Sequence, residues 1–253
     1  MSTVVKERAD APHGFFEAEA AGLRWLAEAD GPRCAEVIGV SPGRIEVARI
    51  HEMVPTVSAA HNFGAALARM HLAGAASFGS PPTGWDGPLF IGERRMPTLT
   101  SESWGEFYAH RRVLPFVDDA VAAGNLTVAE ADVVRRACDL IAARGFDDDA
   151  PPARLHGDLW AGNLLFGADG AVLIDPAAHG GHGETDLAML ALFGAPHLGA
   201  VLNGYASTSP LREGWRARIG LHQLHPLAVH AVGHGRAYGV ALASAARGVL
   251  DAG

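Results

Sequence analysis

One stretch of the sequence, residues 155–176, constrains this chain more than any other. It begins with a polar loop, LHGDLWAGN, and continues as two short apolar runs, LLF and AVLI, on either side of the turn GADG. Apolar runs around a Gly/Asp turn predict a two-stranded hairpin. The hairpin places three polar groups at its ends, Asp158 and Asn163 before the first strand and Asp175 after the second. Two carboxylates and an amide fixed in this way are candidates for chemistry.

The spacing of these groups matches the catalytic loop of protein kinases, H-x-D-x-x-x-x-N, with a second aspartate beyond a hairpin. In phosphoryl transfer one carboxylate accepts the proton of the attacking hydroxyl, while an amide oxygen and a second carboxylate hold magnesium on the nucleotide phosphates. We therefore predict Asp158 as the catalytic base, and Asn163 and Asp175 as ligands of Mg2+. A purely structural alternative, a polar turn between two buried strands, accounts for the hairpin but not for the spacing.

A second pair of residues fits the same chemistry. Lys6 is the only lysine of the chain and lies in a predicted strand over residues 4–8, ahead of a predicted helix over residues 15–29. Kinase-like folds use a strand lysine to contact the nucleotide phosphates and a helix glutamate to orient it. We predict Lys6 for the first role and Glu19, rather than Glu17, for the second.

The pattern after this helix predicts a division into two lobes. Residues 36–40 and 44–50 alternate like a hairpin around a Ser-Pro-Gly turn, and residues 51–55 resemble a connector. We assign residues 1–54 to a nucleotide-binding lobe and residues 55–253 to a larger, mostly helical catalytic and substrate lobe. Main-chain groups near Arg49 and His51 are expected to contact the adenine of ATP. The predicted class is an α+β, bilobal protein-kinase-like fold.

Helical periodicity and capping signals fill the second lobe. Helices are predicted over residues 58–73, from Ser101 or Ser103 onward, over 133–144 behind a capping box at Thr127 and Glu130, over 187–193, and across 198–250. Residues 74–97, rich in Gly and Pro, are expected to form an ordered loop. Asp186 precedes the helix at 187, where it is expected to hydrogen-bond the backbone of the catalytic loop.

Composition excludes several classes of function. The formal net charge of −8 and the lack of a Lys/Arg run argue against a nucleic-acid surface. No apolar stretch reaches the roughly eighteen residues of a membrane span, and no apolar leader follows Met1, so we expect a cytoplasmic protein without membrane contact. Two unpatterned cysteines predict neither a disulfide framework nor a zinc ribbon.

The motifs together resemble the fructosamine kinase (ketosamine-3-kinase) family, within the broader group of aminoglycoside phosphotransferases and choline kinases. The resemblance is carried by HGDLWAGN at 156–163, IDPA at 174–177 and GETDLAM at 183–189, with FEAEA at 16–20 and WGEFY at 104–108 followed by Arg111. It implies ATP- and Mg2+-dependent phosphorylation of a sugar hydroxyl on a ketosamine, a repair reaction on glycated amines. It also implies supporting roles for His156, Trp160 and Asp186 around the catalytic loop.

Two features depart from that family. Its members normally carry two strands and a phosphate-covering loop ahead of the lysine strand, whereas the lysine here is residue 6. We therefore expect either a natural start upstream of Met1 or a truncated nucleotide lobe. They also usually carry a Gln and an Asn after the position of Ile91 and Gly92, where Met96 and Thr98 stand here. This second difference leaves the particular ketosamine open.

Three other functions are open at this point. The first is a non-catalytic kinase-fold protein that binds nucleotide without turnover, and the second is a phosphotransferase for an aminoglycoside or another small hydroxylated acceptor. The third, which the sequence favours least, is a metal-dependent hydrolase. It would use histidines at helical spacing, such as the pairs 179/182, 222/225 and 230/234.

Overall fold

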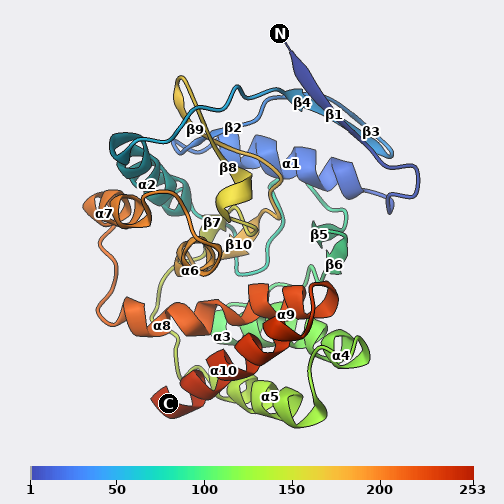
Figure 1. Ribbon diagram of the computed structural model, residues 1–253, viewed down its shortest axis with the longest axis vertical. Coiled ribbons are helices and arrows are strands. Elements are labelled where there is room, and N and C mark those ends of the chain that lie inside the picture. The colour runs from blue at the N-terminus through green and yellow to red at the C-terminus, as the bar shows by residue number, and fades with distance from the viewer. Residues whose placement is uncertain (1) are drawn as a thin grey trace.

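The computed structural model describes residues 2–253, and its first part is a small antiparallel sheet covered by one helix (Figure 1). The strands β1 (Thr3–Glu7), β3 (Val37–Ser41) and β4 (Arg44–Ala48) pair in the order β1-β4-β3. Helix α1 (Phe15–Ala27) buries Phe16 and Leu23 in one hydrophobic cluster with Ile45 and Val47 of β4. The inward-facing side chains of β4 and the apolar face of α1 therefore pack together in a single apolar layer.

The predicted hairpin over residues 164–174 is confirmed. Strand β8 (Leu164–Gly167) pairs antiparallel with β9 (Gly170–Leu173), and Gly170 takes a φ of 105° at the turn. A short strand, β2 (Arg33–Cys34), adds to β9 in parallel. Because β2 follows α1 directly, this pairing joins the N-terminal sheet region to the hairpin. A separate two-stranded sheet joins β7 (Ala153–Leu155) and β10 (His179–Gly181), so the loop that links β7 to β8 is held from both sides.

Helices form most of the remaining chain and enclose two hydrophobic cores. Helices α2 (Val57–Leu72), α6 (Glu184–Phe193) and α7 (Leu198–Thr208) lie beside the hairpin (Figure 1). The other core is built from α3 (Trp104–Phe107), a π-helical turn (Tyr108–Val113), α4 (Leu114–Ala122), α5 (Val128–Ala142), α8 (Trp215–His222), α9 (Leu224–Gly233) and α10 (Arg236–Ala252). These elements occupy the end of the molecule opposite the N-terminal sheet.

Some predicted boundaries were wrong for local reasons. The capping box at Thr127 and Glu130 is present, but α5 begins directly behind it at Val128 rather than at residue 133. Residues 74–97 are not all loop, because β5 (Leu89–Ile91) and β6 (Arg94–Met96) form a hairpin whose turn contains Gly92 at φ 51°. Strands of three residues are too short to show alternation in the sequence.

Across residues 2–253, the helices lack the combination of length and apolarity that a membrane crossing requires.

Candidate active site

The loop between β7 and β8 places Asp158 and Asn163 beside each other. Gly157 starts the loop with a φ of 81°, and a Cβ at this position would lie 2.2 Å from the carbonyl oxygen of Ala177, so only glycine fits here. The loop ends in a 3₁₀ turn, Ala161–Asn163. The side-chain amide of Asn163 donates to the Asp158 carbonyl oxygen at 2.8 Å and to Oδ2 of its carboxylate at 3.1 Å. The loop geometry thus fixes the direction in which the Asp158 carboxylate points.

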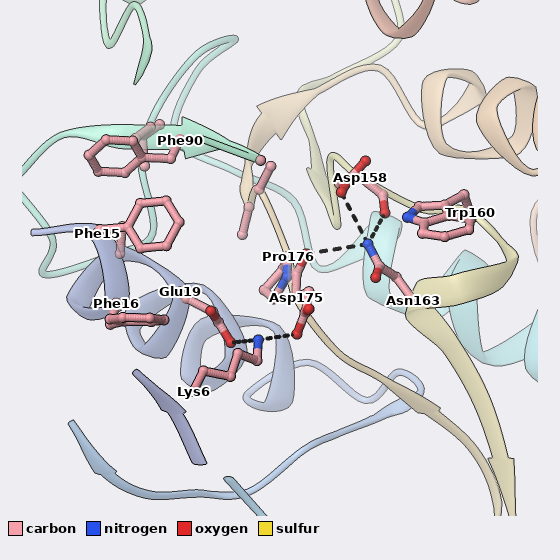
Figure 2. A pocket seen from close by; sticks show the side chains of 15 residues that line it. Lys6, Phe15, Phe16, Glu19, Phe90, Asp158, Trp160, Asn163, Asp175 and Pro176 are labelled. Atoms are coloured by element: carbon pink, nitrogen blue, oxygen red, sulfur yellow. Dashed lines mark hydrogen bonds and ion pairs between the residues drawn. The ribbon is translucent and has the colours of Figure 1, made fainter. Parts of the chain in front are cut away.

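The predicted pairing of Lys6 with Glu19 is present, and Asp175 joins it (Figure 2). The Lys6 ammonium donates to Glu19 Oε1 at 2.6 Å and, on its other side, to Oδ1 of Asp175. Burial acts to lower the pKa of Lys6, but the two carboxylates outweigh it and the pKa lies above its ordinary value. Burial raises the pKa of Glu19 despite the opposing effect of Lys6. Lys6 therefore stays charged between strand β1, helix α1 and the end of β9.

Two cavities meet at this ion pair, and both are lined by Lys6, Glu19 and Asp175. The larger, of about 320 Å³, contains the Asp158 carboxylate and Asn163. Its other wall is largely apolar and is formed by Phe15, Phe16, Leu89, Phe90, Trp160, Pro176, Ala177 and Ala178. Figure 2 shows Phe15 and Phe90 on one side of this cavity and Asp158 with Trp160 on the other. We call it the larger cavity below.

The smaller cavity, of about 180 Å³, lies between the N-terminal sheet and the hairpin. Its lining comes from β1, α1, β4, β8 and the segments that follow β2, β4 and β9. These residues are Val4, Leu23, Ala35, Val47, Ala48, Arg49, Ile50, Glu52, Leu165 and Ile174. Of the two residues predicted to lie at the adenine, Arg49 lines this cavity. His51 is exposed and outside that lining, within 3.4 Å of the Ser2 hydroxyl, while its neighbours Ile50 and Glu52 take part instead.

Burial shifts the pKa of both titratable residues at the start of the loop, in opposite directions. Burial raises the pKa of Asp158 to about 6, with the nearby charges of Asp175 and Asp186 adding to it and the Asn163 amide opposing it. Burial lowers the pKa of His156, so this imidazole is neutral. Its Nε2–H donates to the carbonyl oxygen of Ile174, and its Nδ1 accepts the amide of Asp158. His156 therefore links the backbone of Asp158 to the residue before Asp175.

Asp186 accepts the hydrogen bonds from the loop backbone that the sequence led us to expect. Its carboxylate receives the amides of His156 at 2.8 Å and Gly157 at 3.0 Å. The structure adds two residues that sequence reasoning missed, His71 on α2 and Tyr205 on α7. His71 donates Nε2–H to Asp186 at 3.1 Å, and its Nδ1 accepts the Tyr205 hydroxyl at 2.9 Å. The only hint of His71 and Tyr205 in the sequence was a polar side chain at a helix position that otherwise faces the core.

Trp160 stands at the edge of the larger cavity with 41% of its surface exposed. Gly162 makes room for the indole, because a Cβ there would lie 2.3 Å from the ring. An exposed aromatic ring two residues after Asp158 offers a flat apolar surface to a bound molecule.

A metal-dependent hydrolase would need a group of ligating side chains, and residues 2–253 contain one such group. His182, Glu184 and His222 place ligand atoms within 4.8 Å of one another. However, the Glu184 amide donates to Nδ1 of His182, so the ring carries its proton on Nε2 and donates it to Asp148. A neutral imidazole used in this way has no lone pair left for a metal. Arg218 also donates two hydrogen bonds to the Glu184 carboxylate. His182, Glu184 and His222 are therefore part of an ion-pair network.

Comparison with known proteins gives one consistent result. A family model described as fructosamine kinase matches residues 2–252. A protein of Synechocystis sp. named as a probable ketoamine kinase is 34% identical over 224 residues, which cover 85% of this chain and 72% of that protein.

The solved structures agree with the sequence comparison. A structure from Thermobifida fusca assigned as a fructosamine-3-kinase superposes with a TM-score of 0.90 at 46% identity, covering 98% of this chain and 85% of that one. A choline/ethanolamine kinase family protein from Mesorhizobium loti has a TM-score of 0.59 at 16% identity, with coverages of 98% and 82%. This more distant likeness concerns the fold alone, which is protein-kinase-like as predicted.

Proposed function

The chain belongs to the fructosamine kinase family, and from this premise we propose that it phosphorylates a sugar hydroxyl of a ketosamine with ATP. Membership of that family makes the protein a phosphotransferase with a hydroxyl acceptor. The observation that carries the rest is the meeting of two cavities at Lys6 and Asp175, with the Asp158 carboxylate on one side only.

This arrangement supports a division of labour between the cavities. The smaller cavity, lined by Arg49 and Ile50, suits the adenine. An adenine bound there would place the phosphates of ATP near Lys6. The acceptor would occupy the larger cavity, where Asp158 takes the proton of its hydroxyl. The acceptor oxygen then forms a bond to the terminal phosphorus, the bond from that phosphorus to the bridging oxygen breaks, and ADP leaves.

The residues at the junction fit a magnesium ion. Asn163 uses its NH2 group within the protein, and among residues 2–253 its amide oxygen accepts no hydrogen bond. Asp175 engages Lys6 through Oδ1 alone, which leaves its second oxygen available. Hard oxygen donors of this kind are those that Mg2+ prefers. A bound ion would neutralise charge on the phosphates, and Asn163 and Asp175 would hold it.

The walls of the larger cavity favour a ketosamine over an aminoglycoside. A polycationic acceptor calls for acidic groups beyond the catalytic ones. The acidic run at 147–149 does not supply them, because Asp147 accepts hydrogen bonds from Ser103 and the amide of Gly105, and Asp148 pairs with His182. The remaining wall is aromatic and aliphatic. Phosphorylation that destabilises glycation adducts would give the protein a role in deglycation repair.

The test is ADP release with Mg2+, ATP and fructosyl-lysine or ribulosyl-lysine. We expect turnover that falls by roughly 10²- to 10⁴-fold in Asp158→Asn. Asp169→Asn, an exposed aspartate at the tip of the same hairpin, is the matched control and should keep full activity. Binding of Mg2+ and ADP without turnover of either ketosamine would instead support a non-catalytic nucleotide-binding protein. Turnover of an aminoglycoside alone would reassign the acceptor.

A further inference from the structure

Arg112 is a buried cation without an acidic partner. Its side chain is 1% exposed, and within the described part of the chain, residues 2–253, it makes no ion pair with any carboxylate. Burial lowers the pKa of its guanidinium to about 9, which leaves it protonated at neutral pH. A buried charge without a counter-ion destabilises a fold, so such a residue calls for a reason outside stability.

The contacts of Arg112 are all with neutral groups. Its Nε–H donates to Nε2 of His179 at 3.2 Å, and Nη1 donates to the carbonyl oxygen of Pro97 at 3.0 Å. The guanidinium lies 4.6 Å from the centre of the Phe107 ring. Its Nη2 finds no hydrogen-bond partner among residues 2–253. Nη1 also donates to the carbonyl oxygen of the preceding residue, Arg111, at 3.0 Å. The two contacts beyond its own helical turn, with His179 and Pro97, therefore come from different parts of the chain.

Both contacts lead to walls of the larger cavity. Pro97 directly follows β6, and the β5–β6 hairpin supplies Leu89, Phe90 and Gly92 to that cavity. His179 follows two further wall residues, Ala177 and Ala178, and its Nδ1–H donates to the Ala177 carbonyl oxygen at 2.7 Å. That oxygen is the atom that lies against Gly157 at the start of the catalytic loop. Arg112 thus joins the hairpin wall to the wall beside Asp158.

The backbone around Arg112 is adapted to this position. The residue lies in the π-helical turn Tyr108–Val113, a widening that often occurs at functional sites. The carbonyl oxygen of Arg112 accepts Nδ1–H of His225 at 2.7 Å. Sequence reasoning singled out Arg111 in this segment, but Arg111 is only half-buried and the inward-facing residue is Arg112.

We propose that Arg112 is a positioning residue for the acceptor: it fixes the spacing between the β5–β6 hairpin and the 177–179 segment through Pro97 and His179. The proposal rests on the proposed function, which makes the larger cavity the acceptor site. Without Arg112, the two walls lose their common hydrogen-bond donor, and the acceptor is held less well against Asp158.

The test compares Arg112→Met, which keeps the apolar length, with Arg112→Lys and the neighbouring control Arg111→Met. We expect Arg112→Met to raise KM for fructosyl-lysine about tenfold or more, with KM for ATP unchanged. Its melting temperature should equal or exceed that of the wild type, because an uncompensated buried charge is removed. Arg112→Lys can reach only one of the two partners and should recover part of the acceptor KM, while Arg111→Met should match the wild type.

A structural role would give the opposite pattern. A lower melting temperature in Arg112→Met with an unchanged acceptor KM would overturn the proposal. Amide hydrogen exchange provides a readout that does not depend on activity. Exchange should rise in residues 89–96 and 177–181 of Arg112→Met while residues 3–7 and 44–48 stay as in the wild type. Unchanged exchange in the first two segments would refute the positioning role, even if the wild type turned over no ketosamine and the proposed function itself failed.

Discussion

At the scale of single residues, Asp158 sets the pH at which the proposed reaction can run. A base must be ionised to accept a proton, and burial raises the pKa of this carboxyl to about 6. The ionised carboxylate is present above its pKa and is lost as the pH falls through it, and the raised pKa moves this loss to about pH 6. We predict that kcat/KM for the acceptor declines below about pH 6, roughly tenfold per pH unit, measured by ADP release between pH 5 and 8.

Circular dichroism at each pH would show whether the protein is still folded, so that a loss of activity from protonation of Asp158 is distinguished from unfolding. A rate that stayed level down to pH 5 in the folded protein would show that Asp158 titrates lower or does not limit the reaction. Asp169→Asn should reproduce the wild-type profile, because that carboxylate is exposed and lies away from both cavities.

The sequence revealed some site residues and concealed others for a physical reason. Asp158, Asn163 and Asp175 are separated by one loop and one hairpin, so local structure alone fixes their spacing. The contact between Lys6 and Glu19 was predicted from the strand-then-helix order together with the kinase-like motif downstream, which gave that order its meaning. His71 and Tyr205 act through contacts with segments more than a hundred residues away, and Arg112 contacts His179, which is 67 residues away. No spacing along the chain encodes such contacts.

At the scale of elements, the crossing of α2 and α7 depends on two glycines. A Cβ at Gly64 would lie 1.9 Å from the carbonyl oxygen of Val201, and one at Gly204 would lie 1.9 Å from that of His61. These close approaches let α7 bring Tyr205 to His71, whose other nitrogen holds Asp186. The helix crossing therefore supports, through Asp186, the backbone of the loop that carries Asp158.

We predict that Gly204→Ala destabilises the protein by about 2 kcal/mol or more, because backbone atoms must move apart. This corresponds to a fall in melting temperature of roughly 4 to 8 °C, measurable by calorimetry. Gly199→Ala on the same helix is the matched control, since nothing lies within 4 Å of its added Cβ. It should leave the melting temperature unchanged or raise it slightly. Equal effects of the two substitutions would show that helix propensity, and not the crossing, determines the outcome.

The long helices could be predicted from the sequence, whereas the short strands could not. Helices α1, α2 and α5 carry several turns of apolar periodicity, and each was expected within a few residues of its position. The three-residue strands β5, β6, β7 and β10 contain no repeat that periodicity could detect. The pairing of β2 with β9 joins residues 33–34 to 172–173, a partnership set by tertiary packing.

At the scale of the whole molecule, the N-terminal sheet and the helical body meet on both sides of the candidate site. The covalent link runs along residues 49–56, next to the smaller cavity. On the far side, Phe15 of α1 packs edge-on against Phe90 of β5 at 5.2 Å between ring centres, and Arg8 pairs with Glu93 at 2.9 Å. A nucleotide bound between these connections would touch both parts at once.

We therefore predict that ADP with Mg2+ stabilises the whole chain against heat. A ligand at a hundred times its Kd adds about 2.7 kcal/mol when it binds only the folded state. That gain corresponds to a rise in melting temperature of roughly 5 to 10 °C for a chain of this size. Chelation by EDTA should remove most of the shift. Asp175→Asn should make the shift depend less on Mg2+, because this carboxylate is one of the two proposed ligands.

A shift of the same size with EDTA present would mean that the nucleotide binds without an ion at Asn163 and Asp175. If no shift appears at millimolar ADP, the two cavities do not form a nucleotide site in this chain, and the proposed kinase activity fails with them.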